Sequence, residues 1–130
     1  MAMDTVHRPI PGFVPSTPSV TSSTIDAVLE SHSLVAVHFW AVWNGSDPPM
    51  DAAITRSSSE AHFASCNVDD PKCVDLCKRC GIANVPTVAV FVDGQLRPLI
   101  IGLLDSDALD TAITDRVATP ATERKWWRFW

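Results

Sequence analysis

The run Leu34-Val-Ala-Val-His-Phe-Trp-Ala-Val-Trp43, followed by Asn44-Gly-Ser-Asp-Pro-Pro49, decides the fold. Its first ten residues are almost all apolar, and many are β-branched or aromatic, which predicts a strand buried on both faces. The next six are residues that favour tight turns. Asp47 is a good helix N-cap, and Pro48 suits the first helical position. The stretch therefore predicts a buried strand, a turn and a helix in direct succession.

The flanking sequence supplies the remaining elements of an α/β domain. Apolar spacing predicts helices over 24–31, 71–80 and 106–117, and strands over His62–Val68, Thr87–Val92 and Leu96–Ile101. Asp93-Gly94 is a strong hairpin turn between the last two strands. The early strand–helix–strand order predicts parallel pairing, and the hairpin adds antiparallel strands. We therefore expect a mixed β-sheet with helices on both faces.

Composition limits the classes of function. The chain has 130 residues, enough for one domain, and a net charge of −5, which argues against nucleic-acid binding. Residues 1–23 lack the charged start and apolar run of a secretory signal. The four cysteines lie close together and do not spread through the chain as a disulfide framework would. These features predict an intracellular, reducing compartment, cytoplasmic or organellar, and not a secreted protein.

Three segments carry a resemblance to a known family. They are Val37-His-Phe-Trp-Ala-Val-Trp-Asn-Gly45, Asn67-Val-Asp-Asp70, and Val85-Pro-Thr87 with Phe91 and the Asp93-Gly94 turn. Together they resemble thioredoxin over residues 22–118. The resemblance implies a thioredoxin-like fold, a cis peptide bond at Pro86, and a groove at Trp43, Val85 and Pro86 that pairs with a peptide backbone.

The chain departs from the family at its chemical groups. The family's motif is Trp-Cys-Gly-Pro-Cys, whereas this chain has Trp43-Asn-Gly-Ser-Asp47, and His38 stands where the family carries a buried Asp. Neither Asn44 nor Asp47 can replace a thiolate nucleophile or a resolving thiol. The resemblance thus implies no catalytic residue and no cofactor. It predicts a redox-inactive protein that serves as an interaction or structural subunit of a larger assembly, and that is not an enzyme.

The cysteines leave an alternative open. Cys73, Cys77 and Cys80 are spaced to share one helix face, and Cys66 belongs to the preceding strand. The simplest interpretation is that they are buried as small hydrophobic residues. Cys77 and Cys80, with Lys78 and Arg79 between them, could instead form a displaced redox pair, so thiol–disulfide exchange or redox or metal sensing is the alternative function. No metal site is predicted, because zinc sites usually pair two such motifs.

The two ends of the chain have unusual compositions. Residues 1–20 are proline-rich and are expected to form an extended arm before the domain at 21–118. Residues 119–130 form a basic, aromatic tail. Its candidate docking residues are Trp126, Trp127, Arg128, Phe129 and Trp130. Trp and Arg are favoured anchors of interfaces, so the arm and tail are predicted to bind protein partners. Packing of the tail on its own domain is the second expectation, and contact with a membrane surface is the third.

Overall fold

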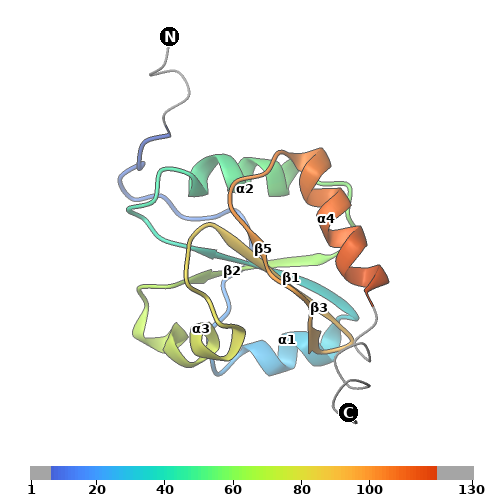
Figure 1. Cartoon of the computed structure of the whole chain (residues 1–130). Helices are drawn as coiled ribbons and strands as arrows, with labels where there is room; N and C mark the ends of the chain where they lie inside the picture. The colour runs from blue at the N-terminus through green and yellow to red at the C-terminus, as the bar shows by residue number, and fades with distance from the viewer. Residues whose placement is uncertain (1–6, 120–130) are drawn as a thin grey trace, which may run out of the picture.

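In the part of the chain that the structure describes, five strands form a mixed sheet and four α-helices cover its two faces, which confirms the predicted fold class (Figure 1). The structure is a computed structural model that describes residues 7–119, so the predicted docking residues of the tail lie outside it. Along the chain the elements are α1 (Ile25–Ser31), β1 (Leu34–Trp40), α2 (Asp47–Arg56), β2 (His62–Asn67), the 3₁₀ helix η2 (Pro71–Cys73), α3 (Val74–Cys80), β3 (Thr87–Val92), β4 (Gln95–Leu96), β5 (Ile100–Ile101) and α4 (Ser106–Ala118).

The sheet has β1 at its centre, between parallel β2 and antiparallel β3. His38 pairs in register with Ser65 on β2 and with Val88 on β3. The antiparallel strands β4 and β5 both pair with β3. The central strand is buried from Val35 to Trp40, as expected for a strand covered on both faces.

Each face of the sheet packs on its own pair of helices. Figure 1 shows α1 and α3 on one side of the sheet, and α2 and α4 on the other. The α1/α3 side buries, among others, Val35, Val37, Phe39, Cys66, Cys73, Leu76, Cys80 and Phe91. The α2/α4 side buries Ala36, Met50, Ile54, Val88, Val90, Ile100, Leu109 and Ile113. Alternate residues of β1 thus supply two separate cores.

Two strands differ from their predicted extents. The central strand ends at Trp40 rather than at Trp43, because the N–H of Ala41 donates to the carboxylate of Asp47 instead of continuing the ladder. The expected return strand over Leu96–Ile101 is split into β4 and β5. Pro98 lies in the break, and proline has no N–H to donate to a sheet.

The role predicted for Asp47 as the N-cap of α2 is wrong. Ser46 takes the N-cap position, and Asp47 is the first residue of the helix. Its side chain turns inward and is completely buried. Interactions with the sheet therefore override the local preference of aspartate for the N-cap position. These interactions cannot be read from a short stretch of sequence.

The described part of the N-terminal arm, residues 7–20, lies along the chain's own domain beside α2 (Figure 1). Val20 donates its N–H to Ser65 O, at 2.8 Å, on the outer edge of β2. The Phe13 ring packs edge-on against Trp40, with ring centroids 5.6 Å apart. Ser16 donates from both N and Oγ to Asp51 Oδ1 on α2. The arm therefore follows the edge of the domain toward the turn after β1.

Candidate functional site

The turn after β1 holds a largely buried hydrogen-bond network that joins His38, Asn44 and Asp47. His38 Nε2 lies 2.7 Å from Asp47 Oδ1, and both side chains have no exposed surface. The second oxygen, Asp47 Oδ2, accepts from Ala41 N at 3.0 Å and from Asn44 Nδ2 at 2.9 Å. Asp47 thus satisfies three donors at once, and it fixes the turn from inside.

This network has no route for a substrate. His38 and Asp47 are fully buried, and the backbone of His7 lies directly over Gly45. A Cβ at position 45 would collide with the His7 carbonyl, so only glycine fits beneath the arm there. Among the described residues, the ring atom His38 Nδ1 is buried without a hydrogen-bond partner. The turn is therefore a structural junction covered by the arm.

A groove opens beside the turn, where the sequence placed Trp43, Val85 and Pro86. The indole of Trp43 is 59% exposed, and its Nε1 donates to Asp69 Oδ2 at 2.8 Å. The peptide bond between Val85 and Pro86 is cis. A cavity of about 130 Å³ lies here, lined by Trp43, Val68, Ile82, Ala83, Asn84 and Val85. The structure thus brings Trp43 and Val85 together at one cavity, whose lining does not include the predicted Pro86. The sequence did not reveal that Asp69 would hold the Trp43 indole.

The cysteines form a cluster on the other side of the sheet from α2. Cys66 on β2 is within side-chain hydrogen-bond reach of both Cys73 and Cys77. Cys73 also donates its S–H to Val20 O at 3.6 Å. The four cysteines, all among the described residues, are free thiols. We refer to Cys66, Cys73 and Cys77 as the thiol cluster.

The sequence predicted that Cys77 and Cys80 could form a redox pair, but the structure places the two side chains in different surroundings. Cys80 is buried in the α1/α3 core, whereas Cys77 is only half-buried and hydrogen-bonds to Cys66. Helical spacing alone puts Cys73 and Cys77 on one face. Recognising Cys66 as their neighbour requires the packing of α3 on β2. The sequence analysis placed Cys66 on the preceding strand but did not group it with Cys73 and Cys77.

Burial controls the acidity of these thiols. It strongly raises the pKa of Cys66, and the neighbouring Cys73 and Cys77 raise it further. Burial raises the pKa of Cys80 to about 11, against the opposing effect of Arg79. Burial also raises the pKa of Cys77, but a hydrogen bond from Cys66 opposes this rise. Cys66, Cys77 and Cys80 are thus mostly protonated at neutral pH, and Cys77 has both the solvent access and the stabilising donor that a reacting thiol needs.

Within residues 7–119 no group of three or more His, Cys, Asp or Glu side chains is arranged to hold a metal ion.

No helix of the described chain is long and apolar enough to cross a membrane.

Comparison with known proteins identifies the family. The thioredoxin family model matches residues 16–115. The chain is 31% identical over 101 residues to the chloroplastic M-type thioredoxin of Brassica napus, covering 74% of this chain and 56% of the relative. It is 31% identical over 100 residues to thioredoxin 1 of Synechococcus elongatus, covering 70% and 92%. The chain spans about half the length of the first curated relatives it matches.

A solved structure gives the same result. Oxidised mitochondrial thioredoxin 3 of Saccharomyces cerevisiae superimposes with a TM-score of 0.63 at 27% identity, covering 77% of this chain and 95% of that one. The names of these relatives and the thiol cluster contradict the prediction of a redox-inactive interaction subunit. They support the alternative, thiol–disulfide chemistry. The chain belongs to the thioredoxin family.

Proposed function

We propose that this chain is a thiol–disulfide redox protein whose reacting groups are the thiol cluster. The observation that carries the proposal is the position of Cys66, whose side chain lies near those of both Cys73 and Cys77. Thiols in such contact need only a small side-chain movement to reach a bonding distance. The relatives named thioredoxins make disulfide exchange the natural chemistry for such a group.

We assign the attacking role to Cys77, because it is the most accessible member of the cluster. Its thiolate attacks one sulfur of a substrate disulfide, the substrate S–S bond breaks, and the departing thiolate takes up a proton. The thiolate of Cys66 then attacks Cys77 Sγ and expels the second substrate thiolate. Two electrons pass to the substrate, which leaves as two thiols, and an internal Cys66–Cys77 disulfide remains. A dithiol reductant returns the protein to its starting state.

The acidity of the cluster makes this a slow exchange. Because burial raises the pKa of Cys77 and of Cys66, few thiolates exist at neutral pH. A thiol pair with this behaviour suits a sensor that responds to sustained oxidation better than a fast general reductase. We therefore place the protein at the slow end of thiol–disulfide exchange.

We further propose that Asn44 and Asp47 occupy the positions of the family's cysteine pair, so the turn no longer exchanges disulfides. The groove at Trp43 remains available for a polypeptide. Val68 lines that groove and follows Cys66 closely along the chain, and Asp69 ties Trp43 to the same segment. A polypeptide bound at Trp43 would therefore lie close to the loop that joins Cys66 on β2 to Cys73, two members of the thiol cluster.

The compartment and partners stay predictions. Relatives named for chloroplasts and mitochondria support the expected intracellular, organellar or cytoplasmic setting. The docking of the arm and tail on a protein partner has no test in the described residues.

Thiol exchange with a chromogenic aromatic disulfide tests the proposal on the native chain. We expect one thiol to react first, and replacement by Cys77→Ser to remove that phase. Cys80→Ser is the matched control, because Cys80 lies on the same helix but in the core, and it should leave the phase intact. Reaction of all four thiols only upon unfolding would contradict the proposal.

A further inference from the structure

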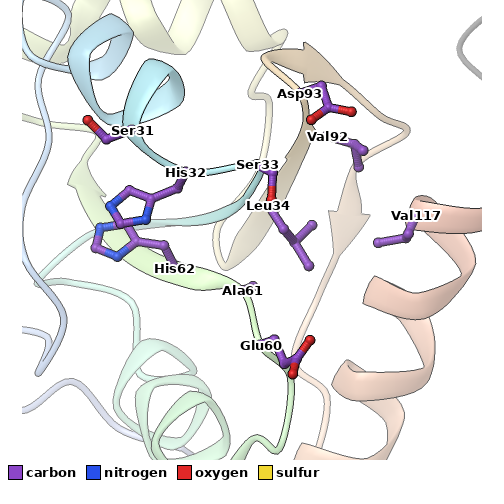
Figure 2. A pocket seen from close by; sticks show the side chains of 10 residues that line it. All are labelled: Ser31, His32, Ser33, Leu34, Glu60, Ala61, His62, Val92, Asp93 and Val117. Atoms are coloured by element: carbon purple, nitrogen blue, oxygen red, sulfur yellow. The ribbon is translucent and has the colours of Figure 1, made fainter.

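A hollow of about 830 Å³ opens at the end of β1 opposite the turn. Figure 2 shows the rings of His32 and His62 on one side of it and Val117 of α4 across from them. The two imidazoles are stacked, with centroids 3.9 Å apart and planes within 1° of parallel. The volume is typical of a ligand-binding site.

The lining of this hollow combines apolar and acidic groups. Leu34, Val92 and Val117 contribute apolar surface, and Val117 is 45% exposed. Glu60 and Asp93 add two carboxylates at opposite ends of the view in Figure 2. Among the described residues that line the hollow there is no lysine or arginine. It therefore suits an occupant that is both aromatic and positively charged.

The chain itself supplies such a segment next to the hollow. Helix α4 ends at Ala118, just after Val117, and Thr119 is the last described residue. Arg97 Nη1 donates to Thr119 O at 2.6 Å, and Arg116 Nη2 donates to Leu99 O at 2.9 Å. These bonds hold the end of α4 at the rim. The eleven residues 120–130 have a maximum extended length of ~35 Å, and they follow directly on a helix whose Val117 lines the hollow.

The composition of residues 124–130 complements the lining. Arg124, Lys125 and Arg128 are cations, and every other residue of this segment is Trp or Phe. Left in water, these aromatic side chains would form a large apolar patch. We propose that residues 124–130 dock into the hollow of their own domain, with the cations facing Glu60 and Asp93 and the aromatic rings covering Val117 and the histidine pair. Of the three destinations that the sequence allows, the structure favours this one.

The first test compares the full-length chain with its Trp126→Ala, Trp127→Ala, Trp130→Ala variant by NMR. We expect chemical-shift changes concentrated on the lining residues, namely His32, Glu60, His62, Asp93 and Val117. The same spectra should be unchanged by dilution, because the contact is within one molecule. Unchanged lining resonances would overturn the proposal. Changes that fade on dilution would assign the tail to a second copy, and would overturn it as well.

Charge reversal gives an independent test in the full-length chain. Glu60→Lys should lower the ratio of docked to free tail a few-fold, as expected for the loss of one ion pair at the rim. The resonances of the lining residues should then move toward their positions in the Trp-deficient variant. Asp75→Lys is the control, because Asp75 is an exposed carboxylate on α3 outside the hollow. Equal effects of both reversals would contradict the proposal. A tail that becomes protected from proteolysis only when phosphatidylserine vesicles are added would also contradict the proposal, because it would assign the tail to a lipid surface.

Discussion

His38 Nε2 and Asp47 Oδ1 lie 2.7 Å apart inside the domain, and neither side chain has any exposed surface. The two residues come from β1 and from the first position of α2, so their contact joins the sheet to the helix. In a dry interior, each member of such a pair depends on the other for its hydrogen bonds. The two side chains thus form one pair, and replacing either of them alone leaves the other without its partner.

Breaking this pair should be costly. Asp47→Ala leaves a buried imidazole and the Ala41 N–H without an acceptor, so we expect a loss of about 3–5 kcal/mol in the free energy of unfolding. In a cycle of the unmodified chain, His38→Leu, Asp47→Leu and the double variant, the double variant should lose less than the sum of the two single variants. It leaves no unpaired imidazole or carboxylate, although the Ala41 N–H still lacks its acceptor. Urea denaturation of the four proteins measures this. Additive losses would show that the pair is not coupled.

The arm over the turn gives a second prediction. Gly45→Ala places a Cβ against the His7 carbonyl, so it should displace the arm without disturbing the core. Phe13→Ala removes the edge-on contact with Trp40 and should have the same effect. Limited proteolysis of the arm should be faster in both variants. Val14→Ala is the control, because Val14 is an exposed residue of the same arm. Gly12→Ala is unsuitable, because Gly12 has a positive φ that alanine adopts only with strain.

Only part of this architecture is visible in the sequence. Val35 to Trp40 and the Asp93-Gly94 turn set the central strand and the hairpin, because their patterns are local and both are strongly biased. The role of Asp47 was misassigned, because its partners Ala41 and His38 are fixed by the path of the turn and not by helix preference. Pro98 also shortens the return strands, although a run of apolar neighbours favours one longer strand.

Less of the candidate site than of the fold could be predicted from the sequence. The spacing of Cys73 and Cys77 shows that they share a helix face, but it does not reveal which strand that face meets. Cys66 joins them only because α3 packs on β2 at that point. The stacking of His32 on His62 is similarly a product of tertiary structure, since one residue follows α1 and the other begins β2.

The histidine pair predicts a response to acid. Burial and the neighbouring His32 lower the pKa of His62 below its usual 6.5, so the folded state favours the neutral ring. The stabilisation is complete above pH 6.5 and is lost as the pH falls below that value, through the lower pKa of the folded protein. Imidazole NMR titration should show a higher pKa for His62 in His32→Gln. An unchanged His62 pKa would show that His32 has no influence.

The thiols predict a response to alkali. Because burial raises the pKa of Cys77 above its ordinary value, the rate of its first exchange step should keep rising with pH throughout the range from pH 7 to 9. An unperturbed thiol, with a pKa near 8.5, would already level off in this range. Cys66→Ala removes the hydrogen bond that opposes the rise, so it should shift the profile to higher pH. A rate independent of pH would contradict the assignment.

The most direct measurement is a map of the disulfide formed when the native chain is oxidised with one equivalent of diamide. Peptide mass spectrometry should find Cys66 linked to Cys77, with Cys80 still free, because the side chains of Cys66 and Cys77 lie near each other whereas Cys80 is buried in the α1/α3 core. The link should be reversed by dithiothreitol and should be absent in Cys66→Ala. A chain that keeps four free thiols, or that joins Cys77 to Cys80, would contradict the thiol cluster as the redox site of this protein.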